Sequence, residues 1–398
     1  MSSPKTAGEM PSTETHEPTR PAPASAPQAP QPPASPVKDE RMTESRWFTK
    51  LLKKPEFASI AGAVLVFAVF GVTAGDSGMF QADGVVNWMQ VSAYLGILAI
   101  GAALLMIAGE FDLSIGSMIG FAGMMVALPA LYFDVPLWAT ILLAFAGSMA
   151  LGAVNGWLVV KTKLPSFIVT LAFLFILRGL TLALSIMFAN RTVVSGVGDL
   201  VAKDWFAQTF FAGTTLGWLT NWLASIHVIG SLADGTPIVP GVPKVIVWWG
   251  VLAVLGAFVL VKTRFGNWIF SVGGDANASR NVGVPVKRVK ISLFVLTAFC
   301  ACLFAVLQVC DIGSAAADRG LQKEFEAVIA AVIGGCLLTG GHGSVIGACF
   351  GALIFGVVQI GITYTNVSSD WFRVFLGVML LIAVLFNNFI RNKVAQSK

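Results

Sequence analysis

Long, unbroken runs of apolar residues dominate the chain from about residue 57 onward. Each run is about 20 residues long, which is the length an α-helix needs to cross a bilayer. Apolar and polar residues do not alternate within the runs, as they would in the strands of a membrane barrel. The pattern therefore predicts an all-α, polytopic membrane protein with about ten transmembrane helices. The predicted segments are residues 57–74, 90–108, 114–133, 137–160, 166–187, 244–262, 291–309, 325–339, 343–364 and 371–390.

Composition supports a membrane location. Hydrophobic residues make up 56% of the chain and charged residues only 12%, and the mean hydropathy is +0.78. A soluble domain carries about 25% charged residues, so this chain has too little polar surface to cover a globule in water. In lipid every backbone polar group must be satisfied internally, which favours helices. The net charge of +5 comes from basic residues in short loops, and a nucleic-acid partner is not expected.

Basic residues between the predicted helices indicate the orientation of the chain. Cytoplasmic loops of membrane proteins are enriched in Lys and Arg. An even number of helices with both termini in the cytoplasm places most of the basic residues inside, whereas omitting the segment 325–339 would put the basic C-terminus outside. The predicted inner residues are Lys50, Lys53, Lys54, Lys161, Lys163, Lys262, Arg264, Arg280, Lys287, Arg288, Lys290, Arg391 and Lys393.

The first 45 residues differ from the rest of the chain. They hold ten of the 18 prolines, mixed with Ala, Ser, Thr and Gln. Such a segment buries too little apolar surface to offset its ordering entropy, so residues 1–45 are predicted to be a disordered, Pro/Ala-rich cytoplasmic tail. It is either passive or a docking arm. Residues 46–398 are predicted to form the transmembrane domain, and no cleavable signal peptide is expected before the run at Phe57.

Catalytic and metal-binding chemistry has little support in the sequence. The five cysteines lie mostly in apolar runs and the three histidines are scattered, so the cysteines are expected to be small core residues and no metal or cofactor is predicted. No Gly-Lys-Ser/Thr phosphate loop occurs, so ATP is not expected to bind this chain. No catalytic residue is predicted.

Polar residues interrupt the apolar pattern at Gly109–Ser117, between the second and third predicted helices. Carboxylates near membrane helices are costly unless they are solvated or paired. Asp112 or Ser114 is well placed to cap the third helix by accepting from its free N–H groups. The alternative is that Glu110, Asp112 and Ser114 form a polar break beside a translocation path.

Arg178 lies inside the fifth predicted helix, about 18 Å from its inner end at about 1.5 Å per residue. An arginine at this depth is a functional hypothesis by default. A structural pair with a carboxylate, or a side chain that reaches toward the outer surface, explains it equally well.

The longest inner loop, residues 263–290, contains a short helix signal. Asp275 is a good N-cap, and Gly283 can end the helix in a left-handed conformation. Such a helix is either a contact for a cytoplasmic partner or an ordinary connection. A weaker similarity links Ala108–Gly116 with Thr339–Gly347 and leaves an internal repeat open.

These motifs resemble the ribose-type family of ABC sugar-importer permeases. The resemblance covers about residues 90–390. It rests on Glu110–Ser117, Asn155-Gly156, Arg178-Gly179, Gly274–Val284 and the stretch from Ala330 through Ser344. It implies a bacterial inner-membrane permease that translocates a monosaccharide or small polyol and forms a homodimer or heterodimer. It also implies two cytoplasmic ATP-binding subunits and a periplasmic sugar-binding protein as partners.

The resemblance further implies that Asp275–Gly283 is the helix that couples the permease to its ATPase. Asp275, Ala276, Ser279, Arg280 and Gly283 match this segment. The best-known importer pattern, Glu-Ala-Ala followed by Gly, is replaced here by Asp275-Ala276-Asn277. Asn155 and Arg178 match family motifs and are candidates for the translocation path or for structural polar contacts.

Two other functions compete with this one. An ion-coupled secondary sugar transporter would bury ionisable relays in its helices, whereas the predicted helices hold Arg178 and almost no carboxylate. An intramembrane enzyme would need a nucleophile beside a base, and His342 with Ser344 is the nearest approximation. The outer segment 188–243, rich in tryptophan, is predicted to be an elaborated loop that holds a short surface helix or contacts the binding protein.

Overall fold

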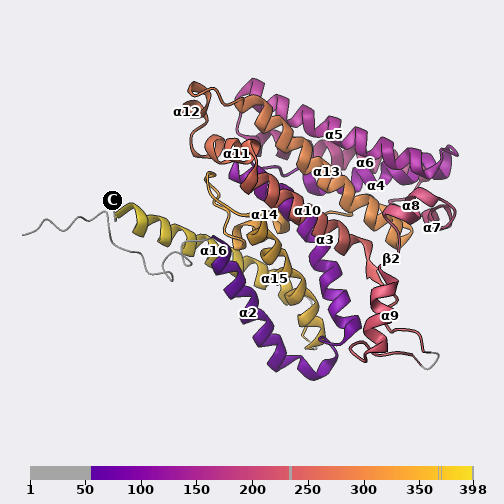
Figure 1. Ribbon diagram of the computed structural model, residues 1–398. Helices are drawn as coiled ribbons and strands as arrows, with labels where there is room; N and C mark the ends of the chain where they lie inside the picture. Colours follow the sequence, from indigo (N-terminus) through magenta and orange to yellow (C-terminus); the bar gives the residue numbers. More distant parts are fainter. Residues whose placement is uncertain (1–54, 233–234, 366, 369, 397–398) are drawn as a thin grey trace, which may run out of the picture. The chain divides into compact units, whose positions relative to one another are not determined.

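The computed structural model describes residues 55–396 except 233–234, 366 and 369. The predicted tail, residues 1–45, lies outside this range. All ten predicted segments fall on helices, and the all-α fold is confirmed. Their bounds are α2 Pro55–Thr73, α3 Ala82–Ile107, α4 Ile115–Tyr132, α5 Leu137–Thr162, α6 Ser166–Ala189, α10 Lys244–Lys262, α13 Val286–Ile312, α14 Lys323–Ile333, α15 Val345–Tyr364 and α16 Trp371–Gln396 (Figure 1).

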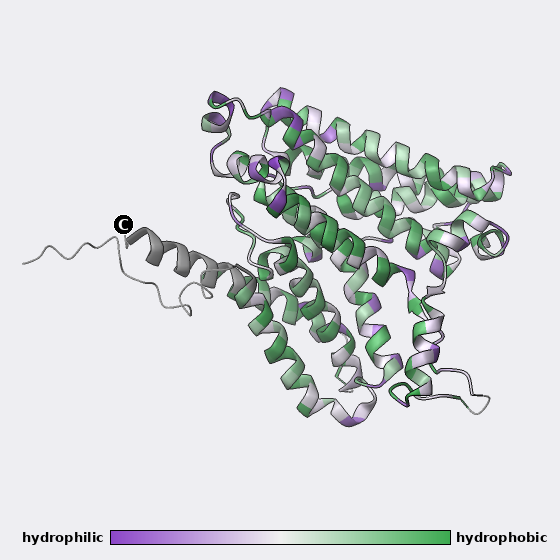
Figure 2. Cartoon of the chain, viewed as in Figure 1, coloured by the Kyte–Doolittle hydropathy of each residue, from purple (hydrophilic) through white to green (hydrophobic). Residues whose placement is uncertain are grey.

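Seven of the described helices are long and apolar enough to cross a membrane, namely α3, α4, α5, α6, α10, α13 and α15. In α2 and α16 the apolar stretches are shorter than a candidate membrane span, and they cover Ser59–Thr73 and Trp371–Ile382. The apolar surface runs along the helices, while polar residues collect where helices end (Figure 2). A multi-pass membrane protein is therefore confirmed, and the count of ten spans stays a prediction.

Two helices form the centre of the bundle. In α3, 83% of the apolar window is buried, and in α13 78%, compared with 17% in α10. α13 packs on α3, α4 and α5, while α3 also packs on α10, α14 and α15. α6 packs on α4 and α2 packs on α15, so these two helices lie farther out. Four of the five cysteines are buried in the core, as predicted, and Cys349 is half-buried.

The segment 188–243 contains short helices, as predicted. They are α7 Val197–Val201, α8 Trp205–Phe210 and α9 Gly217–Ser225, and α9 exposes Trp218 and Trp222. Two small antiparallel ladders order the segment, of which the first joins it to the chain after α13 and the second lies within the segment itself. β1 Val193–Ser195 pairs with β4 Ser314–Ala316, and β2 Thr214–Thr215 pairs with β3 Val242–Pro243.

α14 is only 11 residues long, which at about 1.5 Å per residue is roughly half the thickness of a membrane core. The chain between α13 and α14 runs back along α4, with Ala317 beside Gly120 and Gly320 beside Gly116. The eighth predicted segment, residues 325–339, is therefore not one continuous spanning helix. Its predicted limits missed the first turn of α14, which holds the buried Glu324.

The inner loop 263–290 holds a helix that the sequence analysis missed. α11, Arg264–Gly274, precedes the expected short helix α12, Ala276–Asn281. Phe265, Trp268, Ile269 and Val272 recur at helical spacing and pack into the core. This periodicity was the signal that could have identified α11.

Candidate functional site

The turn between α3 and α4 carries a buried polar cluster. α3 ends at Ile107 and α4 begins at Ile115. Asp112, Ser114 and Asn155 are all buried. Asn155 comes from α5, seven residues before that helix ends, and Thr297 comes from the middle of the central helix α13. The cluster thus joins α4, α5 and α13 inside the bundle.

Hydrogen bonds saturate the Asp112 carboxylate. Its Oδ1 accepts from the Ser114 N–H at 2.9 Å and from the Ser114 hydroxyl at 2.6 Å, and its Oδ2 accepts from the Thr297 hydroxyl at 2.6 Å. The Asn155 amide in turn donates to the Ser114 hydroxyl at 3.0 Å. Asp112 thus closes the turn before α4, but it accepts from none of the N–H groups of the helix itself, so the predicted cap by Asp112 is not formed. Ser114 occupies the N-cap position, but its hydroxyl serves the cluster and makes no capping bond.

The neighbouring residues tie the same turn to other helices. The Glu110 carboxylate forms a salt bridge with Lys290 in the second turn of α13. The Phe111 N–H donates to the Ser166 hydroxyl at the start of α6 at 3.0 Å. Within the described chain, the buried Asn155 Oδ1 has no hydrogen-bond partner. The α3–α4 turn is thus fixed to three further helices through polar contacts.

Arg178 and Glu324 are two further charged residues within the helix bundle. Glu324 lies in the first turn of α14 and is buried. Its carboxylate lies against Gly116, and a side chain at position 116 would overlap with that carboxylate. Arg178 on α6 is half-buried, and its positive charge acts on the Glu324 carboxylate. No direct ion pair between them is found among the described residues. The Glu324 Oε2 likewise lacks a hydrogen-bond partner there.

We predict that Arg178→Leu lowers both the folded yield and transport, because it leaves the Glu324 charge buried without its compensating cation. Glu324→Gln in the same chain should restore part of the loss. A double-mutant cycle on the thermal unfolding of the purified protein measures the coupling, which we expect to be about 0.5–3 kcal/mol. Additive effects of the two substitutions would show that the residues act independently.

α12 has the capping expected from the sequence. The Asp275 Oδ1 accepts from the backbone N–H of Asn277 at 2.8 Å and of Ala278 at 3.0 Å. The Ala278 and Asn277 bonds hold the pKa of Asp275 below its usual value. The cap is therefore fully formed at neutral pH and is lost as the pH falls through this lowered pKa. Gly283 follows the helix with a φ of +87°, the left-handed conformation that was predicted.

The remaining coupling candidates lie on different sides of α12. Ser279 is buried, where its hydroxyl lies 2.6 Å from the Ser271 hydroxyl of α11 and donates to the Asp275 carbonyl. Ala276 is half-buried and packs against the core. Arg280 is exposed, and Val282 is 78% exposed directly after the helix. Ser279 and Ala276 thus hold α12 to the bundle, while Arg280 lies on its exposed surface.

The end of α11 meets two other turns at close range. The Gly341 N–H donates to the Ile107 carbonyl at 2.8 Å. A Cβ on Gly273 would lie 1.8 Å from the same carbonyl oxygen, and a Cβ on Gly340 would lie 2.8 Å from the Gly109 Cα. The turns Ala108–Gly116 and Thr339–Gly347, similar in sequence, therefore touch, and both contact the segment that leads into α12.

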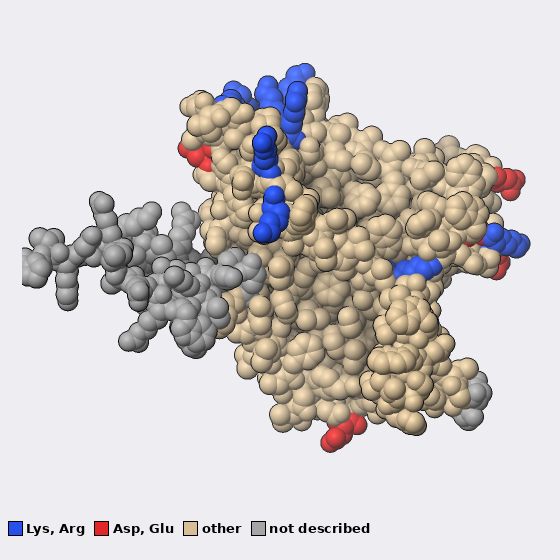
Figure 3. Space-filling model, viewed as in Figure 1, with Lys and Arg blue, Asp and Glu red and all other residues tan. Residues whose placement is uncertain are grey.

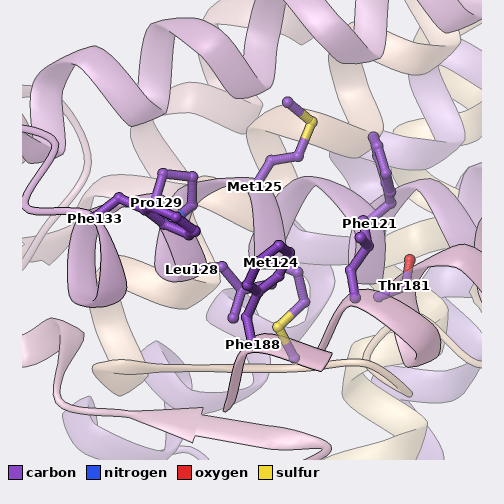
Figure 4. A pocket seen from close by; sticks show the side chains of 9 residues that line it. Phe121, Met124, Met125, Leu128, Pro129, Phe133, Thr181 and Phe188 are labelled. Carbon is purple, nitrogen blue, oxygen red and sulfur yellow. The ribbon is translucent and has the colours of Figure 1, made fainter. Parts of the chain in front are cut away.

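An apolar cavity of 140 Å³ lies between the C-terminal halves of α4 and α6. Phe121, Met124, Leu128 and Phe188 point into it (Figure 4). The hydroxyl of Thr181 at its edge is bonded to the Leu177 carbonyl. A sugar needs polar groups to bind its hydroxyls, so this cavity is not a sugar site.

A bundle of long apolar helices that encloses a polar cluster defines a multi-pass membrane protein. The comparison with protein families agrees with this class. The family described as "Branched-chain amino acid transport system / permease component" matches residues 84–384. The chain belongs to this family of transport permeases.

Named relatives cover nearly the whole chain. The xylose transport system permease protein XylH of Escherichia coli K12 is 30% identical over 370 residues, which cover 84% of this chain and 92% of that protein. The ribose import permease protein RbsC of the same strain is 29% identical over 343 residues, 86% of this chain and 96% of that protein. XylH of Haemophilus influenzae is 30% identical over 359 residues, 81% of this chain and 93% of that protein. No solved structure matches the chain.

Membership of a transport family sets aside the intramembrane enzyme. His342 is exposed, and the Ser344 hydroxyl accepts from the Gly347 N–H as a helix cap. Of the three buried carboxylates, Glu110 and Asp112 lie in the α3–α4 turn and only Glu324 lies in a helix. Family membership favours the ABC permease over the ion-coupled transporter.

Proposed function

We propose that this chain is the membrane-spanning permease subunit of an ABC importer that translocates a monosaccharide across the bacterial inner membrane. The observation that carries the proposal is the similarity to xylose and ribose permeases over more than four-fifths of the chain. Separate ATP-binding subunits supply the energy, since the sequence has no phosphate-binding loop. A binding protein on the outer side delivers the sugar, and segment 188–243 is its proposed contact.

The ATP-binding subunits dock on the exposed side of α12 in this proposal. Ala278, Arg280 and Val282 are exposed there, and Asp275 and Gly283 set where the helix begins and ends. Ser279 and Ala276 attach the helix to α11 and the core, so a displacement of α12 by the ATPase subunit also displaces α11. The basic loops support an arrangement with ten spans and both termini in the cytoplasm. The resemblance to ABC permeases is the ground for proposing a dimer of permeases in the membrane.

Reconstitution tests the proposed function. The permease is co-purified with the ATPase subunit and binding protein from its own organism and placed in proteoliposomes containing ATP. Uptake of labelled xylose, ribose and a panel of hexoses and polyols is then measured. We expect uptake of one monosaccharide that requires ATP and the binding protein. Uptake driven by a proton or sodium gradient without ATP would instead establish the secondary transporter.

We predict that Ala278→Trp abolishes sugar-stimulated ATP hydrolysis and uptake while the permease still inserts in the membrane. The bulky side chain prevents α12 from fitting into the surface groove of the ATPase subunit. Asn267→Trp on the exposed side of α11 is the matched control and should retain both activities. Ala276→Trp and Gly283→Trp should also uncouple the complex, the latter because of its positive φ. Wild-type activity in all three variants of the α12 segment would show that it is an ordinary loop.

A further inference from the structure

A second cavity, of 1030 Å³, opens beside α12 at the inner end of the bundle. The ends of α5, α12 and α13 form its walls, and the α3–α4 turn reaches it through Glu110. It is large enough for a headgroup and the first part of a hydrocarbon chain, since pockets for small ligands measure about 300–1,000 Å³. Figure 3 shows Lys and Arg side chains gathered at the end of the bundle that carries α11 and α12.

Positive charge in this cavity is not balanced by the described residues that line it. Its basic lining residues are Lys161, Lys163, Arg280, Lys287 and Lys290. Glu110 is the single carboxylate among the lining residues, and Lys290 already pairs with it. Four cations therefore remain without a carboxylate in the cavity wall. Like charges held this close repel one another, and an anion bound between them removes the repulsion.

The wall is also apolar on the side toward α6. Trp157 and Leu164 line the cavity and are 47% and 48% exposed. The Lys161 ammonium lies over the Trp157 ring, 4.4 Å from its centre. Phe167 and Ile168, in the first turn of α6, continue this exposed apolar surface. Tryptophan and lysine side by side at the end of a membrane helix mark the level of the lipid headgroups.

We propose that this cavity binds the phosphate headgroup of an anionic phospholipid of the inner leaflet. The phosphodiester lies among Lys161, Lys163 and Lys287, and the acyl chains leave past Trp157 and Leu164. A basic pocket between membrane helices on the cytoplasmic side is the setting in which such headgroups bind. The bound lipid connects α5 and α13 with the face of α12 that carries Ala276, Asn277 and Arg280.

A ligand that offers only a phosphate group does not account for the apolar residues in the cavity wall. A free phosphate or nucleotide would make no use of the exposed Trp157, Leu164 and Phe167, whereas a lipid places its acyl chains on them. An acidic surface of a soluble partner would contact Arg280 and Lys287, but it would leave the apolar flank in the bilayer unmatched. The combination of cations and an apolar exit favours the lipid.

Native mass spectrometry of the full-length permease tests the proposal. The detergent-solubilised protein is titrated with an equimolar mixture of phosphatidylglycerol and phosphatidylcholine that carry the same acyl chains. We expect the wild type to retain phosphatidylglycerol preferentially. In Lys161→Gln/Lys163→Gln/Lys287→Gln, the ratio of the two bound lipids should fall by about tenfold or more, because each cation near an anionic headgroup contributes measurably to binding.

The matched control is Lys262→Gln/Arg264→Gln, which removes basic residues from the same inner surface but outside the cavity. It should keep the wild-type ratio. Equal retention of the two lipids by the wild type, or an unchanged ratio in the triple variant, would overturn the proposal. Displacement of the lipid by millimolar inorganic phosphate would identify a free-anion site instead. Loss of the ATPase subunits from the triple variant with unchanged lipid retention would identify a protein-docking surface instead.

Discussion

Gly273→Ala is expected to reduce transport by about tenfold or more, whereas Gly274→Ala, one residue further along α11, should transport almost normally. A Cβ on Gly273 would lie 1.8 Å from the Ile107 carbonyl oxygen and 2.6 Å from the Gly341 nitrogen, but a Cβ on Gly274 meets no atom within 4 Å. Both contacts are with backbone, so they are relieved only by moving whole segments. Overpacking of this kind costs about 1–3 kcal/mol, and each 1.4 kcal/mol is about a factor of ten.

Comparing the two variants separates the effect of the close contact at Gly273 from the effect of replacing a glycine with alanine. Both replace a glycine in the last turn of α11 with alanine, so both gain the same helix propensity. Uptake and sugar-stimulated ATP hydrolysis are measured in the reconstituted complex, together with thermal unfolding of the permease alone. A Gly273→Ala permease that unfolds at a lower temperature and loses uptake fits the prediction. If the two variants transported equally well, the close contact between α11, α3 and the α14–α15 turn would have no mechanical role.

Asp112→Ala is expected to give little folded protein and no measurable uptake, because it removes the acceptor for three hydrogen bonds inside the bundle. The Ser114 N–H, the Ser114 hydroxyl and the Thr297 hydroxyl all donate to this carboxylate. Thr297 keeps the Phe294 carbonyl as an acceptor, so the two Ser114 donors are the ones left without a partner. A buried donor left without an acceptor costs about 1–3 kcal/mol, and two of them together cost a large part of the stability of a typical domain, which is about 5–15 kcal/mol.

Asp112→Asn is the informative control, since asparagine has the same shape and retains one carbonyl oxygen. Ser114 can still donate to that oxygen, and the introduced side-chain amide can donate to the Thr297 hydroxyl, which also bonds the Phe294 carbonyl. We expect this variant to fold and transport within about threefold of wild type, a difference of about 0.6 kcal/mol. Normal folding combined with complete loss of uptake would show that the path requires the negative charge of Asp112.

The sequence predicted the spanning helices well because each depends on the local match between about 20 apolar residues and the bilayer. The same reasoning identified the Asp275 cap and the left-handed Gly283, which involve residues only a few positions apart. It could not identify the Glu110–Lys290 pair, whose members are 180 positions apart. Contacts of that kind depend on how the helices pack, which hydropathy does not reveal.

Glu324 illustrates the opposite error. Its charged neighbours Lys323 and Glu326 make the first turn of α14 look like an outer loop, and hydropathy places it there. The structure buries it because the chain before α14 returns along α4 and brings the carboxylate to Gly116. A single-sequence reading has no means of recognising a crossing made partly by extended chain and partly by a short helix, because the apolar length of that helix is the length of an ordinary soluble one.

The short length of α14 has a consequence for how the protein is made. A helix of 11 residues that begins with Lys323 and Glu324 is too short and too polar to leave the translocon for lipid by itself. It gains a suitable environment only when α3, α4 and α15 surround it. Because α15 follows α14 in the chain, α14 reaches its final position only after α15 has been synthesised. Biogenesis of the permease therefore couples the insertion of α14 to tertiary folding, and substitutions that delay the packing of α15 should expose α14 to membrane proteases.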